Sequence, residues 1–242
     1  MSGLEAVTFD FWNTLMWEPE GALVAARLPA LCEVLAGSGI DATVGQVTAC
    51  HEVAFQRYQT AWRANEQYRV PDAVDTMVAE LGVAADEELR NRLEEAFNHG
   101  GRSADIRLTP GIEQCLASLQ RAGIRLSIIC DIGLTPSPVV RWHLERHGLL
   151  KFFDGWVFSD EVGAYKPDAR VFELALDQLG VDARRAAHVG DRRRTDVAGA
   201  LGAGLAAIRY RGVYDDVDAA EPEASHVIDH HGDLPAIAIG QP

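Results

Sequence analysis

The chain has 242 residues, enough to bury a full hydrophobic core, either as one large α/β domain or as a core with a smaller inserted domain. Hydrophobic residues make up 48% of the chain and charged residues 24%, which excludes the class of intrinsically disordered proteins. The formal net charge of −14 argues against nucleic acid and against an anionic membrane as partners.

The sequence also predicts where the protein resides. No apolar run approaches the roughly 20 residues that a membrane span needs, and the N-terminus has no basic stretch followed by an apolar one. We therefore expect a cytoplasmic protein without a membrane anchor. The cysteines show no CxxC spacing and are expected to be free thiols in a reducing compartment; they are Cys32, Cys50, Cys115 and Cys130.

The first predicted strand covers about residues 5–10. It lies in the run "VTFDFWNTL" (7–15), which is apolar on both sides of a single carboxylate, Asp10. An apolar strand of this kind belongs in the interior of a sheet, and a carboxylate at its end is either a turn residue or part of a site.

Residues 17–104 contain long helical patterns and no convincing strand. We interpret this stretch as a helical insertion on the exit loop of the first strand, with the Gly-, Pro- and charge-rich flanks 16–21 and 100–108 as hinges. The predicted domains are a core of residues 1–15 and 105–242 and a helical cap of residues 16–104.

From about residue 109 onward, short β-rich runs alternate with helical patterns. This alternation is typical of an α/β fold with a parallel sheet and helices on its faces. The predicted strands are 124–130, 155–158, 186–189, 205–209 and 225–228.

Two of the intervening helices have clear end signals. One is expected to begin with Thr109 as N-cap and Pro110 at the first helical position, and to stop at Gly123. The other is expected to begin at the cap residue Asp168 and to end at Gly180. Its apolar residues at helical spacing are Phe172, Ala175, Leu176 and Leu179.

Polar residues follow the predicted strands at their carboxyl ends, where ligands collect in open parallel sheets. Asp10 follows the first strand, and Cys130 and Asp131 lie at the end of the second. Further along the chain come Lys166, Asp191 and Asp196. Carboxylates that bind a divalent metal, together with a lysine that offsets negative charge, are what phosphoryl or acyl transfer needs.

These residues lie in the strings "VTFDFWNTL", "KPDARVF" and "HVGDRRRTDVAGALGAG", which resemble the haloacid-dehalogenase-like hydrolase superfamily over nearly the whole chain. The first motif of that family is an Asp nucleophile, a spacer, commonly a second Asp, a spacer and Thr. It falls on Asp10, Trp12 and Thr14. The second motif, a Ser or Thr at the end of the next strand, falls on Cys130 and is followed by Asp131.

The third motif is Lys166 before a proline, and the fourth is Gly190 and Asp191 followed by Asp196. The helical insertion directly after the first motif also fits the small cap of this family. The resemblance implies a Rossmann-like parallel-sheet core with an inserted α-helical cap domain.

The resemblance further implies an Mg²⁺-dependent reaction through an aspartyl-phosphate. Asp10 would be the nucleophile and would hold the metal together with Asp191 and the backbone carbonyl of Trp12. Asp196 would support the metal site through water or by orienting Lys166. Lys166 would pair with Asp10 and with the phosphate. The remaining phosphate-binding candidates are Asn13, through its backbone N–H, and Thr14, Cys130 and Asp131.

Three departures from the family pattern stand out. Trp12 replaces the second Asp, which in family phosphatases protonates the leaving oxygen and then activates water. The thiol of Cys130 is a poorer hydrogen-bond donor than the hydroxyl expected there, so it should bind phosphate more weakly. A buried structural cysteine is an equally good interpretation of this residue. The carboxylate of Asp131 would repel a phosphate unless it points elsewhere or is protonated.

Three functions follow from these departures. The favoured one is a hydrolase, a Mg²⁺-dependent phosphatase or phosphotransferase acting on a small phosphorylated or otherwise anionic metabolite with a good leaving group. The second is a 2-haloacid dehalogenase, since those enzymes bear an aromatic residue at the position of Trp12 and expel halide without an acid. The third is a non-catalytic binding protein. Dehalogenases typically replace the first acid of the fourth motif, so the presence of Asp191 and Asp196 favours metal-dependent chemistry.

Two further clusters have less specific interpretations. The run Arg192, Arg193 and Arg194 is expected to be a solvated face for at least two of its members, with one arginine able to reach an anionic substrate tail. His230 and His231 are expected to be surface imidazoles.

Overall fold

The computed structural model describes residues 3–240. Its internal contacts divide the chain into two compact units. The first, called the core unit here, comprises the chain up to Trp17, Arg107–Asp131 and the chain from Leu144 onward. The second, called the helical unit, comprises Glu18–Ile106 and Ile132–His143.

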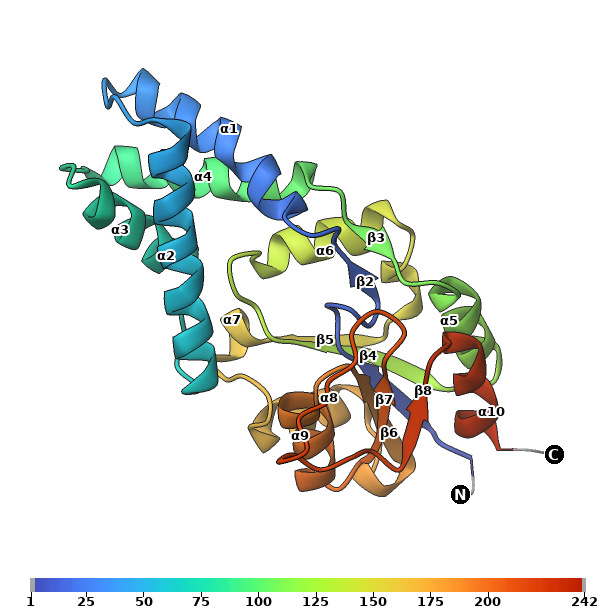
Figure 1. Ribbon diagram of the computed structural model, residues 1–242. Coiled ribbons are helices and arrows are strands. Elements are labelled where there is room, and N and C mark those ends of the chain that lie inside the picture. Colours follow the sequence, from blue (N-terminus) through green and yellow to red (C-terminus); the bar gives the residue numbers. More distant parts are fainter. Residues whose placement is uncertain (1–2, 241–242) are drawn as a thin grey trace. The chain divides into compact units, whose positions relative to one another are not determined.

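The core unit is built on a six-stranded parallel sheet with the strand order β5-β4-β1-β6-β7-β8 (Figure 1). The α/β prediction is therefore confirmed, and each strand lies within one or two residues of its expected position. The strands are β1 (Ala6–Phe9), β4 (Arg125–Cys130), β5 (Gly155–Phe158), β6 (Ala186–Gly190), β7 (Ala206–Tyr210) and β8 (His226–Ile228).

Strand β1 lies between β4 and β6, and all of its residues are buried. Phe9 is in register with Ile128 of β4 and with Val189 of β6. Because the three strands are parallel and aligned in this way, the residues that follow them meet at one edge of the sheet. The strand order also reverses at β1, because β4 and β5 lie on one side of it and β6, β7 and β8 on the other. Open α/β sheets bind their ligands at such a point.

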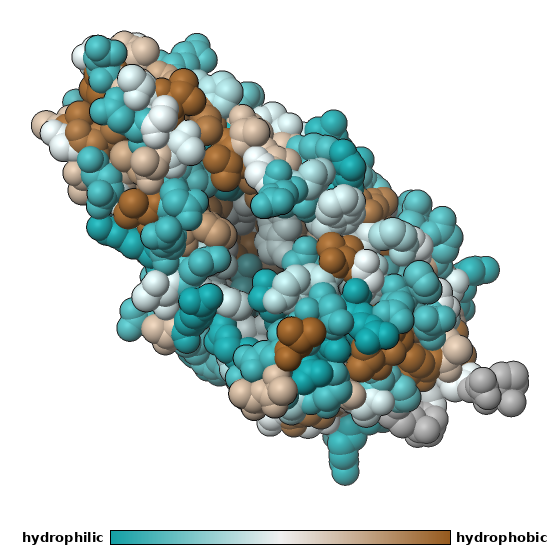
Figure 2. Space-filling model, viewed as in Figure 1, coloured by the Kyte–Doolittle hydropathy of each residue, from teal (hydrophilic) through white to brown (hydrophobic). Residues whose placement is uncertain are grey.

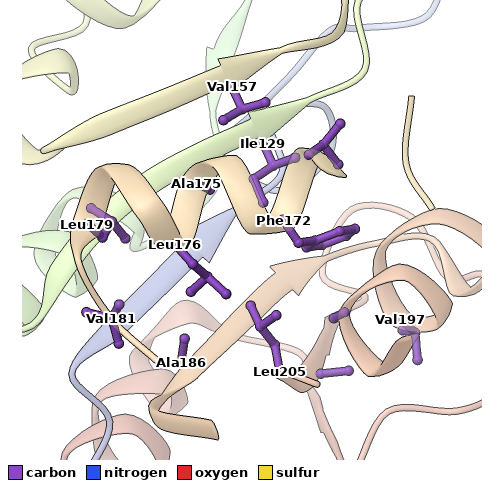
Figure 3. Close-up of a cluster of buried hydrophobic side chains, with 14 of the residues drawn as sticks. Ile129, Val157, Phe172, Ala175, Leu176, Leu179, Val181, Ala186, Val197 and Leu205 are labelled. Atoms are coloured by element: carbon purple, nitrogen blue, oxygen red, sulfur yellow. The ribbon is translucent and has the colours of Figure 1, made fainter. Parts of the chain in front are cut away.

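Helix α8 shows how the sequence pattern produces the core. It spans Ala169–Leu179, and its N-cap Asp168 accepts a hydrogen bond from the Arg170 backbone N–H at 3.0 Å, as expected. Gly180 ends it in the left-handed conformation with φ of 62°. Its apolar side packs on the sheet, as Figure 3 shows for Phe172, Ala175, Leu176 and Leu179.

The other helices connect the strands of the core unit or cover the sheet. They are α5 (Ile112–Arg121), α6 (Ser137–Arg146, which begins in the helical unit), α7 (Ser159–Val162), α9 (Ala198–Gly202) and α10 (Leu234–Ile239). Short 3₁₀ helices span Leu150–Phe152, Ala183–Arg185 and His231–Asp233, and a π-helical turn spans Arg193–Val197.

The predicted start of α5 is wrong. Its N-cap is Gly111, with φ of 78°, so the helix begins two residues later than expected. The hydroxyl of Thr109 donates instead to the carbonyls of Thr14, at 2.7 Å, and of Leu15, at 3.1 Å. Thr109 therefore fixes the loop after β1 and does not cap a helix. The predicted stop is confirmed, since Gly123 follows the helix with φ of 77°.

The helical unit consists of four helices between residues 18 and 106, all of which the structure describes, and the segment Ile132–His143. The helices are α1 (Ala22–Gly37), α2 (Val44–Arg63), α3 (Val70–Leu81) and α4 (Glu87–Ser103) (Figure 1). Their facing apolar residues form one cluster that includes Leu31, Val47, Val74 and Phe97. An amphipathic helix on its own could not bury this surface, which explains why the helices pack together.

A buried arginine links the segment Ile132–His143 to the helices. Arg27, which is 3% exposed, donates to the carbonyl of Leu134 at 2.5 Å and to the hydroxyl of Thr135 at 2.8 Å, and its guanidinium lies over the Phe97 ring. The segment therefore groups with the helices in its contacts, whereas the predicted boundaries assign it to the core. The domain boundaries themselves stay a prediction.

The two predicted hinges contain short strands. β2 (Met16–Trp17) pairs antiparallel with β3 (Arg107–Leu108), and residues 100–103 belong to the end of α4. Strands of this length have no detectable periodicity, which is why the sequence indicates only loops here.

The face in Figure 2 is predominantly hydrophilic, in keeping with the charge of −14, and its hydrophobic residues occur in small separate groups. Among residues 3–240, no helix is both long and apolar enough to cross a membrane. All the cysteines lie in this part of the chain and are free thiols, as expected.

Candidate active site

The loop after β1 presents the predicted nucleophile. Asp10 directly follows the strand, donates its backbone N–H to the Val189 carbonyl at 2.8 Å and is only 6% exposed. The loop then turns tightly at Asn13, whose φ of 59° is left-handed, and the Asn13 N–H donates to the Met16 carbonyl at 2.7 Å. Asparagine tolerates this conformation better than most residues, so the sequence suits the turn.

Lys166 lies against Asp10 in the interior. Its Nζ donates to Asp10 Oδ1 at 2.6 Å, to Asp196 Oδ1 at 2.6 Å and to the Ile129 carbonyl at 3.0 Å. These acceptors satisfy every proton of the ammonium group, which is why a lysine can be 2% exposed here. The neighbouring carboxylates outweigh the opposing effect of burial and hold the pKa of Lys166 well above its usual range.

Asp196 reaches the site from the π-helical turn after β6. Its Oδ2 accepts the Arg192 backbone N–H at 2.9 Å, while its Oδ1 accepts Lys166. A β-carbon at Gly190 would lie 2.3 Å from Asp196 Cγ, so only glycine leaves room for this carboxylate. Burial raises the pKa of Asp196, but Lys166 and His188 overcome that effect and hold it below its usual range.

Asp10, Asp191 and Asp196 are all buried, and each offers an oxygen atom within 4.8 Å of the others. Burial raises the pKa of Asp10 to about 7 despite Lys166, and burial with repulsion from Asp10 and Asp196 raises the pKa of Asp191 well above its usual range. Burial and mutual repulsion thus disfavour the ionised forms of Asp10 and Asp191, and a bound cation would favour them. An oxygen-only donor set of this kind fits a hard divalent cation such as Mg²⁺.

The other predicted phosphate contacts are placed as follows. The Thr14 hydroxyl is buried and has no hydrogen-bond partner within residues 3–240. Asn13 donates its side-chain amide to Asp191 Oδ2 at 3.2 Å. Asp131 accepts the Lys166 backbone N–H at 2.9 Å, so at least this oxygen points away from a phosphate. Cys130 is 1% exposed, and burial raises the pKa of its thiol, which keeps it protonated.

Trp12 is half-buried and lies two residues after the predicted nucleophile Asp10. Its indole packs edge to face on Phe11, with ring centroids 4.8 Å apart. This contact places an apolar side chain, without an ionisable proton, at the position of the usual second acid.

The structure adds polar residues that the sequence analysis did not single out. His188 of β6 is paired in register with Thr8 of β1, and both are buried. A signal was present, because each is an isolated polar residue inside an otherwise apolar central strand. His231 is also buried, and its Nε2 lies 2.9 Å from the Thr14 carbonyl and 3.0 Å from the Thr109 hydroxyl. The expectation of a surface imidazole is therefore wrong for His231, whereas His230 is exposed.

All members of the arginine run after Asp191 are half-buried, so the run reaches solvent and also has partners in the protein. Arg193 donates its backbone N–H to Asp216 at 2.8 Å and pairs with Glu223. Arg192 lies over the Tyr214 ring, 4.3 Å from its centroid, and its Nε is 3.6 Å from Asp191 Oδ2. Asp216, Glu223 and Tyr214 all belong to the connection between β7 and β8, so these arginine contacts hold that connection close to the site.

Comparisons with known proteins agree with this geometry. Residues 4–204 match a hydrolase family described as haloacid dehalogenase-like hydrolase. The chain is 31% identical over 206 residues to a glyceraldehyde 3-phosphate phosphatase of Methanothermobacter thermautotrophicus, covering 85% of this chain and 84% of that protein.

Two solved structures share the fold. A 2-haloacid dehalogenase from Pseudomonas syringae pv. Tomato superposes with a TM-score of 0.72 at 24% identity and 97% coverage of both chains. The putative HAD-hydrolase YfnB from Bacillus subtilis, bound to magnesium, superposes with a TM-score of 0.68 at 20% identity, covering 98% of this chain and 99% of that one. With the family match over most of its length and Asp10, Lys166, Asp191 and Asp196 gathered at the end of its parallel sheet, the chain belongs to the haloacid dehalogenase-like hydrolase family.

Proposed function

We propose that the protein is a Mg²⁺-dependent phosphatase that acts through an aspartyl-phosphate on a small phosphorylated metabolite with a good leaving group. The observation that carries this proposal is the contact of the Lys166 ammonium with Asp10 inside a buried cluster of aspartates. The hydrogen bond from Lys166 fixes the orientation of the Asp10 carboxylate. The ammonium group also places a positive charge where an anionic substrate would approach.

In the first step, Asp10 attacks the phosphorus atom. Lys166 holds Asp10 Oδ1, so Oδ2 is the oxygen that forms the new bond. The bond between phosphorus and the leaving oxygen breaks, and the phosphoryl group is transferred to the carboxylate. Splitting hydrolysis into two displacements lowers the barrier of each. In the second step, water attacks the same phosphorus and releases phosphate and free Asp10.

Lys166 reduces the repulsion between the anionic nucleophile and the anionic substrate. The Thr14 hydroxyl and the Asn13 backbone N–H are proposed to bind phosphate oxygens, together with Cys130 as a weak donor. Asp131 is proposed to act through its hydrogen bond to the Lys166 backbone and not by touching phosphate.

Asp10, Asp191 and the Trp12 carbonyl are proposed to hold Mg²⁺, with Asp196 in support. The metal, when bound, supplies positive charge that stabilises the transferring phosphoryl group. Asp196 already accepts hydrogen bonds from Lys166 and from the Arg192 backbone, which leaves it suited to orienting the lysine.

Trp12 limits the range of substrates. General acid–base help of the kind that the missing Asp provides is worth roughly a hundredfold to ten-thousandfold in rate. Acyl and aryl phosphates can be cleaved without a general acid, because their leaving groups are stable as anions. The glyceraldehyde 3-phosphate phosphatase among the relatives and a phosphoserine phosphatase of Thermus thermophilus, 32% identical over 171 residues, support a small phosphorylated metabolite as the substrate class.

The test measures phosphate release from acetyl phosphate and p-nitrophenyl phosphate with Mg²⁺ and with excess chelator. We expect turnover that needs the metal and that the Asp10→Asn variant lacks. The matched control is Asp177→Asn, since Asp177 is an exposed aspartate on α8, and this variant should retain wild-type activity.

Turnover that persists in chelator, or in the Asp10→Asn variant, would contradict the proposal. Halide release from 2-chloropropionate without metal would establish the dehalogenase alternative. A folded wild-type protein that turns over neither class of compound would be a non-catalytic member of the family.

A further inference from the structure

We propose that His188 is a positioning residue, which holds the Asp196 carboxylate and through it the Lys166 ammonium in place beside the nucleophile Asp10. His188 touches none of the groups that we expect to react. The catalytic part of this inference rests on the proposed phosphatase function, whereas its structural part can be measured without a substrate.

A continuous series of buried hydrogen bonds supports the proposal. His188 Nδ1 lies 2.8 Å from the Thr8 hydroxyl, and His188 Nε2 lies 3.1 Å from Asp196 Oδ1. The same Asp196 oxygen accepts Lys166 Nζ at 2.6 Å, and Nζ donates to Asp10 at 2.6 Å. Thr8, His188, Lys166 and Asp196 are each 2% exposed or less, so water does not compete for these contacts.

The chemistry of the partners determines which ring nitrogen carries the proton. Asp196 Oδ1 faces an ammonium group, so it is an ionised acceptor and His188 Nε2 must be the N–H donor. His188 Nδ1 then has a lone pair and accepts the Thr8 hydroxyl. Of the two neutral tautomers, only this one donates to Asp196, so Asp196 selects it and the Thr8 hydroxyl adapts by donating to Nδ1.

His188 adds a side-chain donor to Asp196 Oδ1 beside Lys166, and the Thr195 hydroxyl lies 3.5 Å from Oδ2. With His188 and Lys166 on Oδ1 and the Arg192 backbone N–H on Oδ2, the carboxylate cannot rotate without breaking a hydrogen bond. Packing acts in the same direction, because the Phe172 ring meets the imidazole edge to face at 5.2 Å. Asp196 is thus a fixed support for Lys166.

Substitutions that separate hydrogen bonding from packing test the inference. His188→Leu removes both ring nitrogens, whereas His188→Gln keeps an amide N–H at about the reach of Nε2. By analogy with other outer partners of catalytic groups, we expect kcat on p-nitrophenyl phosphate to fall by roughly tenfold to a hundredfold in His188→Leu. KM should change little, and His188→Gln should recover most of kcat.

Two variants serve as comparisons. Thr8→Val removes the hydroxyl at constant shape and should give a smaller loss of kcat, because Asp196 still demands the Nε2 proton. His230→Leu replaces an exposed histidine and should leave kcat at the wild-type value. Thermal unfolding of every variant reports whether a loss of kcat follows from a loss of folded protein.

The tautomer is read from the imidazole ¹⁵N chemical shifts of His188 in the substrate-free protein. We expect a protonated Nε2 and an unprotonated Nδ1. A proton on Nδ1 would overturn the proposal, as would equal losses of kcat in the folded His188→Leu and His188→Gln variants. A wild-type protein with the expected tautomer but no phosphatase turnover would contradict the proposed function and leave the hydrogen-bonded arrangement standing.

Discussion

Trp12 is the departure from the family pattern with the largest expected effect on which leaving groups the site can release. Its backbone keeps the position of a metal-binding carbonyl, but its side chain packs on Phe11 and has no proton to exchange. Burial raises the pKa of Asp10, the proposed nucleophile, to about 7, and Lys166 opposes that shift. At the scale of residues, the proposed site therefore keeps its nucleophile and lacks the acid of the family pattern.

The first prediction concerns the leaving group. Trp12→Asp should raise kcat/KM on alkyl phosphates more than on aryl phosphates, because only the poorer leaving group needs a proton. The measurement is steady-state kinetics on one substrate of each kind, with Trp156→Asp on the outer strand β5 as the control. Equal effects on both substrates would mean that the missing acid does not limit the reaction.

At the scale of elements, the junction of β6 with the π-helical turn decides how the site is assembled. The strand ends at Gly190, and Asp196 lies in the turn Arg193–Val197. The Asp196 carboxylate occupies the space that a side chain at position 190 would need. A glycine is required here by close approach and not by backbone conformation. The same elements carry Asp191, so one short segment supplies two of the three clustered carboxylates.

The second prediction follows from this junction. Gly190→Ala would place a β-carbon 2.3 Å from Asp196 Cγ, and the carboxylate would have to leave Lys166. We expect loss of activity and a destabilisation of about 1–3 kcal/mol, measured by chemical unfolding. Gly202→Ala is the matched control, because nothing lies within 4 Å of the added carbon. Normal activity of a Gly190→Ala variant would show that the position of Asp196 is not critical.

At the scale of the whole molecule, every residue of the candidate site comes from the core unit. Asp10 lies in the stretch before the helical unit, whereas Lys166, Asp191 and Asp196 lie in the stretch from Leu144 onward. The parallel sheet joins these stretches in one body. Ligands of this site should therefore stabilise the folded core unit, and titration of its buried groups should change the stability with pH.

The third prediction is stabilisation by Mg²⁺. A ligand at a hundredfold excess over its Kd adds about 2.7 kcal/mol to the free energy of unfolding, which raises Tm by roughly 5–10 °C in a chain of this size. Asp191→Asn should abolish this shift. Without metal the same variant should melt higher than wild type, because the substitution removes a buried charge next to Asp10 and Asp196. Scanning calorimetry at matched ionic strength checks both, with NaCl in place of MgCl₂ as the control.

The fourth prediction is a loss of stability in acid through His231. Burial lowers the pKa of His231 from 6.5 to about 4, so the unfolded chain binds the extra proton between these values. Stability should therefore be full above pH 6.5 and fall as the pH drops toward 4, by roughly 3 kcal/mol from this group. Urea unfolding across that range should show a weaker dependence in His231→Gln than in wild type, and His230→Gln should match wild type.

The sequence by itself determined the architecture and the order of the site residues. Apolar runs of strand length and helices with clear end signals are local patterns, so β1, β4 and α8 could be predicted within a residue or two. The register of a parallel sheet then places Asp10 and Asp191 at one edge, because parallel strands carry their last residues to the same side.

Only the tertiary structure decided how the polar side chains pair. Thr8 and His188 are 180 residues apart, and Thr14 and His231 are 217 apart, yet each pair is hydrogen-bonded in the interior. The N-cap expected at Thr109 was wrong for the same reason, since its hydroxyl found partners across the fold. A hydrogen bond depends on distance and angle in three dimensions, and spacing along the chain does not encode those for residues that the sheet brings together.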